Sequence, residues 1–126
     1  MKDDKKRILI VDDEYFLVET LKTRLEYAGY DVLTAENGAD AVTTLEKEPV
    51  DLIVMDYMMP VMDGVEATKK IKANKKWKGV PIIFLTARAR PEDRKTVYAS
   101  GAEDYLSKPF ETDDLLAMME KWLSKK

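Results

Sequence analysis

Hydrophobic residues fall along this chain in five short runs, separated by longer stretches in which apolar and polar positions alternate with helical period. The runs cover residues 7–11, 32–35, 52–55, 82–86 and 105–107. Three of them, the first, third and fourth, contain the uninterrupted apolar segments ILIV, LIVM and IIFL. Runs of this kind are typical of strands in a parallel sheet, because such strands are buried on both faces.

The intervening stretches repeat apolar residues at the spacing of one helix face. In the first stretch this face would be formed by Leu17, Val18, Leu21 and Leu25. Gly29 predicts the end of that helix, since glycine readily adopts the left-handed conformation that follows many helices. Pro91 and Gly101 predict the two ends of a fourth helix, and Thr112 predicts the cap of a fifth.

The alternation of strand and helix therefore occurs five times, which predicts an α/β fold with helices on both sides of a parallel sheet. The length of 126 residues suits a single domain. We expect residues 1–126 to form that domain, with an ordered core over about residues 6–124 and no output domain. In such doubly wound folds, ligands bind at the carboxyl ends of the strands.

Composition removes several classes of function. The chain has no Cys and no His, which excludes thiolate chemistry and the usual zinc ligands. The net charge of −3 argues against a surface dedicated to nucleic acid. No run is long and apolar enough to cross a membrane, so we expect a cytoplasmic protein that binds neither membrane nor nucleic acid directly.

Polar residues follow four of the predicted strands at the point where each strand ends. Asp12 and Asp13 follow the first strand, Asp56 the third, Thr86 closes the fourth, and Lys108 follows the fifth. Because parallel strands end at one edge of the sheet, these side chains should share a crevice. Each has a plainer interpretation alone: the aspartates as helix caps or turn residues, Thr86 as a strand residue, Lys108 as a solvated charge.

Three carboxylates in one crevice repel one another, and a bound cation would relieve that repulsion. Only oxygen ligands are present, which favours Mg²⁺, with Mn²⁺ as an alternative. Asp56 would then be a carboxylate nucleophile toward phosphorus, with an acyl phosphate as its product. Thr86 and Lys108 would neutralise charge on the transferred group.

The chain resembles the response-regulator receiver domains of two-component signalling, over essentially its whole length. The matching segments are ILIVDDE, DLIVMDYMMPVMDG, PIIFLTA and GAEDYLSKPF. The resemblance implies a flavodoxin-like, CheY-like fold with five helices around a five-stranded sheet of order 2-1-3-4-5. It also implies a phosphorylation-activated switch rather than an enzyme that turns over outside substrates.

Carried over by position, the resemblance assigns Asp56 as the phosphoacceptor. Asp13 would contact Mg²⁺ directly, Asp12 through water, and Met58 through its backbone carbonyl. Thr86 and Lys108 would bind phosphoryl oxygens. A cis peptide bond between Lys108 and Pro109 is also implied.

The same resemblance predicts how the signal leaves the domain. The Thr86 hydroxyl would be free before phosphorylation and would then bind a phosphoryl oxygen. Tyr105 would turn from outside to inside and fill the space that Thr86 vacates, which changes the surface formed by the fourth helix, fifth strand and fifth helix. A strand aromatic with its hydroxyl in water is the plainer interpretation of Tyr105.

Partners follow from the same assignment. Without His the chain cannot form a phosphohistidine, so the donor would be a histidine kinase or phosphotransfer protein. An unidentified downstream protein would receive the signal. We expect a monomer or a weak dimer that depends on phosphorylation.

Three other functions are compatible with an α/β fold. A haloacid-dehalogenase-like phosphatase would carry a second Asp where Met58 stands, and a nucleotide-binding domain would need a Gly-rich turn where Asp12, Asp13 and Glu14 stand. A binding module that works without phosphorylation would leave the complete set of motifs unused.

Overall fold

A computed structural model describes residues 5–125 of the chain. The elements in chain order are β1 (Arg7–Val11), α1 (Tyr15–Tyr27), β2 (Asp31–Ala35), α2 (Gly38–Lys47), β3 (Leu52–Met55), α3 (Gly64–Ala73), β4 (Ile82–Thr86), α4 (Pro91–Ala99), β5 (Asp104–Ser107) and α5 (Thr112–Leu123). The strands form one parallel sheet of order β2-β1-β3-β4-β5, which confirms the predicted fold class. The domain predicted for residues 1–126 includes residues 1–4 and 126, which lie outside the described residues.

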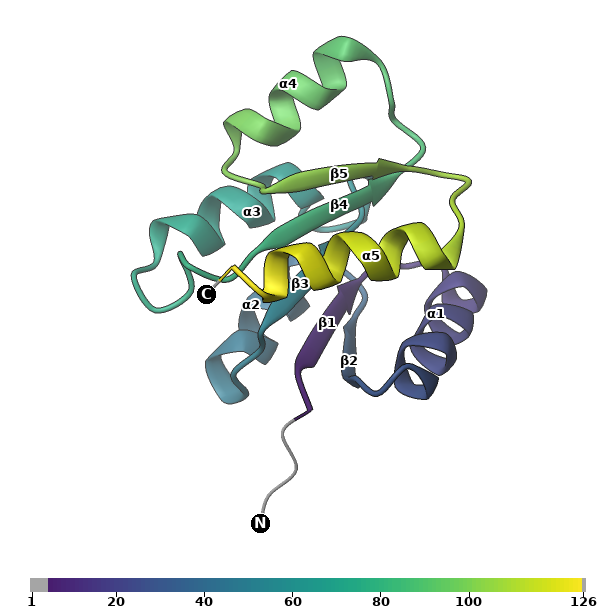
Figure 1. Ribbon diagram of the computed structural model, residues 1–126. Helices are drawn as coiled ribbons and strands as arrows, with labels where there is room; N and C mark the ends of the chain where they lie inside the picture. The colour runs from purple at the N-terminus through teal and green to yellow at the C-terminus, as the bar shows by residue number, and fades with distance from the viewer. Residues whose placement is uncertain (1–4, 126) are drawn as a thin grey trace.

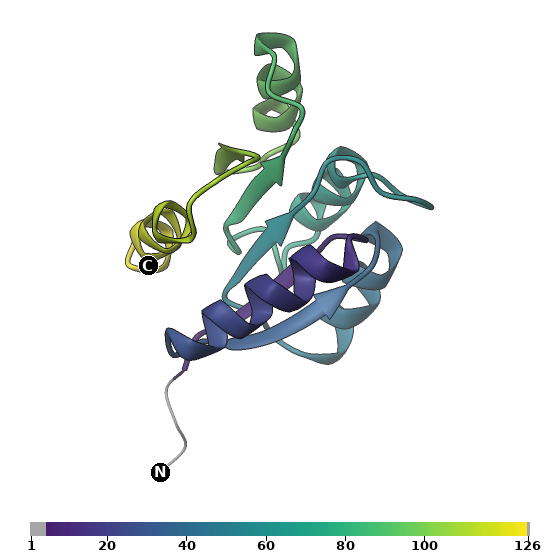
Figure 2. The same cartoon turned by 90° about the vertical axis from the view of Figure 1, so that its right-hand side faces the viewer.

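Helices cover both faces of this sheet (Figures 1 and 2), and the strand sequences show why. Successive side chains of a strand point to opposite faces. In β1, Ile8 and Ile10 join the cluster that packs under α1 and α5, whereas Leu9 and Val11 join the cluster under α2, α3 and α4. The segments β3 and β4 divide their side chains in the same way, so the continuous apolar runs are accounted for by burial on two sides.

The helix ends agree with the sequence except at one cap. Gly29 and Gly101 adopt positive φ values of 104° and 109° just after α1 and α4, and Pro91 is the first residue of α4. Thr112 was expected to cap α5, but it is the first helical residue and Glu111 occupies the cap position without a side-chain cap bond. The acidic residues Asp113 and Asp114 lie in that first turn, where the helix dipole favours negative charge.

Candidate functional site

Backbone pairing continues past the strand ends and places the candidate residues side by side. The amide of Asp12 donates to the carbonyl of Ala35 at 3.0 Å, and the amide of Asp56 donates to the carbonyl of Val11 at 2.9 Å. Further along the same edge, where β4 and β5 end, the amide of Lys108 donates to the carbonyl of Thr86 at 2.9 Å. Main-chain hydrogen bonds thus hold these residues at the sheet edge, and their side chains are not needed for that purpose.

The carboxylates of Asp12, Asp13 and Asp56 converge, with one oxygen of each lying within 4.8 Å of the others. Asp12 and Asp56 are buried, at 5% and 8% exposure, whereas Asp13 is exposed. One oxygen of Asp56 accepts the amide of Tyr57 at 2.8 Å, and one of Asp12 accepts the amide of Glu14 at 2.9 Å. The second oxygen of Asp12 accepts from Lys108 at 3.2 Å, whereas the amide of Tyr57 leaves the second oxygen of Asp56 for another partner.

Lys108 is the cation of the cluster. Its Nζ atom lies 3.2 Å from an oxygen of Asp12, 2.9 Å from one of Glu14 and 3.8 Å from one of Asp56. The peptide bond from Lys108 to Pro109 is cis. One ammonium group thus faces three carboxylates, so negative charge is in excess even before Asp13 is considered.

The pKa values reflect this excess. Burial, followed by the charge of Asp12, raises the pKa of Asp56 from 3.8 to about 6, against the opposing effect of Lys108. Burial likewise raises the pKa of Asp12. Burial works to lower the pKa of Lys108, but its hydrogen bond to Glu14 and the charges of Asp12 and Asp56 outweigh that effect and raise it. The carboxylates fit a divalent cation, since oxygen ligands meet here with too little positive charge.

Two residues within the motifs have structural roles that sequence reasoning did not assign. Glu14 is an ion-pair partner of Lys108, and its place directly after the two aspartates was the available indication. Gly64 is required by a close approach: a Cβ atom there would meet the carbonyl oxygen of Asp56, and its amide donates to Tyr57 at 2.9 Å. The Asp63–Gly64 pair, with Asp63 capping α3, could have indicated this position.

The two proposed switch residues differ from their expected starting states. The hydroxyl oxygen of Thr86 is not free, because it accepts the amide of Arg88 at 3.2 Å. Tyr105 was expected to begin outside, but its ring is buried at 8% exposure. Its hydroxyl is also buried and has no hydrogen-bond partner among the described residues, which excludes the plainer interpretation of a hydroxyl in water. Met58 is largely exposed beside Asp56.

A family model described as the response regulator receiver domain matches residues 8–120. The chain belongs to this family. Receiver domains are phosphoacceptor switches of two-component signalling, not enzymes that turn over outside substrates.

Curated relatives agree. The chain is 41% identical over 115 residues to the alkaline phosphatase synthesis transcriptional regulatory protein PhoP of Bacillus subtilis, which covers 91% of this chain and 47% of PhoP. It is 42% identical over 123 residues to a probable transcriptional regulator of Pyropia yezoensis, covering 98% of this chain and 49% of the relative. The chain thus spans about half the length of the curated relatives it matches.

Solved structures place the fold in the same family. A response regulator from Chloroflexus aurantiacus superposes with a TM-score of 0.93 at 32% identity, covering 97% of this chain and 100% of the other. The receiver domain of a sensor histidine kinase from Pseudomonas aeruginosa superposes at 0.90 with 36% identity over 96% and 99% of the two chains, and it contains a magnesium ion in its active site cleft. Among residues 5–125, no helix is long and apolar enough to cross a membrane.

Proposed function

We propose that Asp56 accepts a phosphoryl group from a phosphohistidine of a histidine kinase or phosphotransfer protein. The observation that supports this most strongly is the convergence of three aspartate carboxylates with Lys108 at one sheet edge. In the transfer, an oxygen of Asp56 forms a bond to phosphorus while the bond from phosphorus to the donor nitrogen breaks. The electron pair stays on the imidazole, which then takes up a proton, and Asp56 becomes an acyl phosphate.

Asp12, Asp13, Asp56 and the carbonyl of Met58 would hold a magnesium ion, with manganese as a substitute. The two buried carboxylates each keep an oxygen that their own amide contacts do not use, and Asp13 reaches the cluster from solvent. When bound, the ion supplies positive charge that offsets the carboxylates and the phosphoryl oxygens. The magnesium ion in the Pseudomonas aeruginosa receiver supports this proposal.

Lys108 and Thr86 would bind the phosphoryl group on its other oxygens. Lys108 lies within 4 Å of Asp56 and is the only described lysine that contacts this carboxylate, so its charge is available where negative charge increases. Thr86 is the last residue of β4, which pairs with β3, the strand that directly precedes Asp56. Its hydroxyl oxygen accepts the amide of Arg88, and its hydroxyl hydrogen would donate to a phosphoryl oxygen.

The signal would leave through the surface formed by α4, β5 and α5. A cavity of ≈ 480 Å³ lies on this surface, and its lining includes Arg94, Tyr98, Tyr105, Pro109, Phe110 and Asp114. Tyr105 contributes both to this cavity and to the core under α4. A change at Thr86 would therefore reach the surface through Tyr105, and an unidentified downstream protein would recognise the result. Association of two phosphorylated copies through this surface would be weak.

The test is a measurement of intact mass after incubation with acetyl phosphate and Mg²⁺. We expect the wild type to gain one phosphoryl group, and to gain none with a chelator present or with ATP alone. The variant Asp56→Asn should gain none, because an amide oxygen is a poor nucleophile. Asp51→Asn, a carboxylate at the other end of β3, is the matched control and should behave as wild type. An equal mass gain in Asp56→Asn would refute the assignment.

A further inference from the structure

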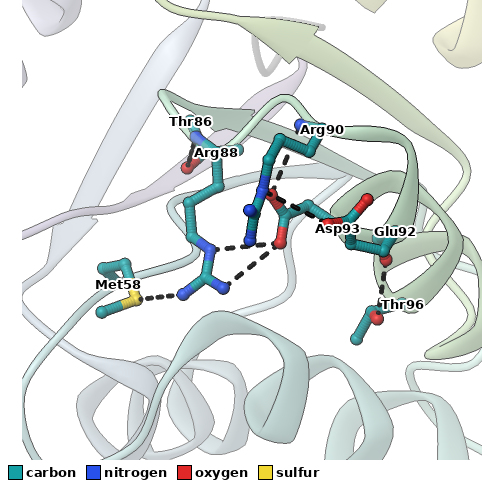
Figure 3. Close-up of polar contacts among 7 residues, drawn as sticks. All are labelled: Met58, Thr86, Arg88, Arg90, Glu92, Asp93 and Thr96. Carbon is teal, nitrogen blue, oxygen red and sulfur yellow. Dashed lines mark hydrogen bonds and ion pairs between the residues drawn. The ribbon is translucent and has the colours of Figure 1, made fainter.

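Arg88 bridges the two loops that follow β3 and β4 (Figure 3). It lies two residues after Thr86, and its Nη1 atom lies 3.2 Å from the sulfur of Met58. Its guanidinium carbon lies 4.5 Å from the centre of the Tyr57 ring. Both contacts fall on the segment that directly follows Asp56, so Arg88 covers the chain next to the acceptor although it belongs to the loop before α4.

A buried carboxylate in the first turn of α4 holds Arg88 in this position. The Oδ1 atom of Asp93 lies 3.2 Å from Nη2 of Arg88 and accepts from Nε at 3.3 Å. The Asp93 side chain is only 6% exposed, whereas that of Arg88 is 40% exposed. A charge-assisted pair in which one member is buried orders the exposed member more firmly than a surface pair would.

Helix capping explains the contacts of only one of the two carboxylate oxygens of Asp93. The Oδ2 atom of Asp93 accepts the amide of Arg90 at 3.3 Å and lies 3.6 Å from Nε of Arg90, which closes the first turn. The Oδ1 atom is directed at Arg88 instead (Figure 3). A neutral side chain with one carbonyl oxygen would be enough for the cap, so the second oxygen and the negative charge need another explanation.

We propose that Asp93 is a positioning residue for the loss of the phosphoryl group from Asp56. By holding Arg88 against Met58, Asp93 keeps a bridge beside the acceptor that restricts the approach of water and prolongs the phosphorylated state. This inference rests on the proposed function, and it extends control of the site to α4.

The reaction being slowed is hydrolysis of the acyl phosphate. The oxygen of a water molecule forms a bond to phosphorus while the bond from phosphorus to the Asp56 oxygen breaks. Asp56 leaves as a carboxylate, and the product is inorganic phosphate, which with solvent takes up the protons of the water. The attacking and leaving oxygens must lie roughly in line, so access for water on the side away from Asp56 controls the rate.

A link between α4 and this access has a consequence for regulation. Two residues of α4 line the cavity, Arg94, which directly follows Asp93, and Tyr98, which lies five residues after it. A partner that shifts the first turn of α4 would move Asp93 and with it Arg88. The lifetime of the phosphoryl group would then depend on whether the partner is bound, and partner affinity would depend on phosphorylation in return.

The experiment measures the first-order loss of the phosphoryl group by intact mass after the donor is removed. The variant Asp93→Asn keeps an oxygen for the amide of Arg90 but removes the charge that holds Arg88. We expect it to lose phosphate about threefold faster or more, the rate equivalent of a modest coupling between residues in contact. Arg88→Ala should show the same increase, and the double variant should be no faster than either single variant.

Two controls separate positioning from loss of helix structure. Glu92→Gln removes the neighbouring carboxylate, which is 65% exposed and pairs with Arg90 but not with Arg88, and it should leave the rate unchanged. Lys95→Gly weakens α4 at an exposed position without touching the pair, and it should also leave the rate unchanged.

Each other outcome overturns the inference. An unchanged rate in Asp93→Asn, or additive effects in the double variant, would show that the pair does not act as a unit. Slower loss in Arg88→Ala would show that Arg88 assists water instead of restricting it. If Lys95→Gly is as fast as Asp93→Asn, helix stability is responsible. A wild type that gains no phosphoryl group would refute the proposed function and this inference together, whereas normal gain with unchanged loss refutes the inference alone.

Discussion

Two partly buried lysines lie at opposite edges of the same sheet, and their surroundings differ. Lys72 on α3 lies near the amino end of β4. Its Nζ atom contacts Glu103 at 2.7 Å and the carbonyl oxygens of Lys78 and Val80 at 3.1 Å and 2.8 Å. The second carboxylate oxygen of Glu103 accepts the amide of Ile82 at 2.8 Å. One positive and one negative charge are balanced here, and both have neutral partners for their remaining bonds.

Lys108, at the carboxyl edge, lies among Asp12, Glu14 and Asp56, all within 4 Å. Negative charge exceeds positive charge, and the pKa of Asp56 is raised to about 6 because burial and Asp12 oppose its ionisation. Two carboxylates are thus kept close together at a cost to folding stability.

The comparison shows two uses of a buried lysine. Where its charge is balanced by one carboxylate, the pair stabilises the fold, and where carboxylates are in excess, the cluster is suited to binding a cation or a reacting group. At the Lys72 edge, removing any member leaves a partner without its counter-charge, so the arrangement stabilises the fold only as a complete set. At the Lys108 edge, the excess of carboxylates is relieved by adding positive charge or removing negative charge. The predictions below test this contrast, from the largest expected effect to the smallest.

Replacement of Lys72 should cause the largest change in stability. Lys72→Met removes the counter-charge of Glu103 and the donor to two carbonyl oxygens, so we expect the free energy of unfolding to fall by about 3 kcal/mol. Phosphorylation of Asp56 should be unaffected, because the other edge is untouched. Urea denaturation gives the stability, and Lys70→Met, on the exposed side of the same helix, is the control. A loss below about 1 kcal/mol would be that of an ordinary surface ion pair, and the Lys72 site would then not be the stabilising counterpart of the Lys108 site.

The opposite sign is expected for Asp56→Asn in the presence of a chelator. The folded-state pKa of Asp56 is about 6, above the reference value of 3.8, so the folded protein binds this proton more tightly than the unfolded chain. Wild-type stability should therefore fall as the pH rises from 4 to 7, and the variant should lack that loss. We expect the variant to be about 2 kcal/mol more stable at pH 7 and nearly equal at pH 4.

Urea denaturation across this pH range measures the difference, and Glu46→Gln, an exposed carboxylate on α2, is the matched control. A variant that is less stable at pH 7 would show that the attraction between Asp56 and Lys108 outweighs burial and the repulsion from Asp12.

Magnesium should stabilise the wild type by a smaller amount. At a concentration ten times its dissociation constant, a ligand that binds only the folded state adds about 1.4 kcal/mol. Lys72→Met should keep this increment. Asp13→Ala should lose most of it yet change little in chelator, because Asp13 is exposed and the repulsion at Asp56 comes from Asp12. Thermal melts with and without Mg²⁺ give both quantities, and an undiminished increment in Asp13→Ala would remove Asp13 from the ligand set.

Tryptophan emission should show almost no response to Mg²⁺. Trp122 donates to Asp104 at the start of β5, and Trp77 precedes β4, so both rings lie toward the amino edge of the sheet. A fluorescence titration of the wild type tests this, with Asp13→Ala as the variant in which binding should be weakened. Strong quenching that Asp13→Ala reduces would show that the two edges are coupled after all.

Much of the fold could be predicted from the sequence, because strands buried on both faces appear as uninterrupted runs of apolar residues. Three of the strands begin and end as the apolar runs predicted, and the sheet order is the one implied by the motifs. The strands β2 and β5 each begin one residue earlier than predicted, at Asp31 and Asp104. A polar residue at the start of a strand breaks no hydrophobic pattern, so the sequence does not reveal whether it is paired.

The residues of the candidate site were also predictable as a set. Parallel strands end at one edge, so whatever follows Val11, Met55 and Ser107 must meet there, and the structure brings Asp12, Asp56 and Lys108 together. The contacts that give each residue its state were not predictable. The bond from Arg88 to Thr86, the buried hydroxyl of Tyr105 and the pairing of Asp93 with Arg88 depend on side-chain directions across loops.

The sequence by itself therefore determined the layers and the residue types that collect at the carboxyl edge, because hydrophobic period and the alternation of strand and helix act through neighbours along the chain. The strand order followed from the resemblance of its motifs to receiver domains. Only the tertiary structure decided which carboxylate is buried, which lysine is balanced and which arginine crosses from one loop to the next. Those outcomes depend on distances of a few ångströms between residues far apart in sequence, and both Coulomb energy and desolvation change steeply over such distances.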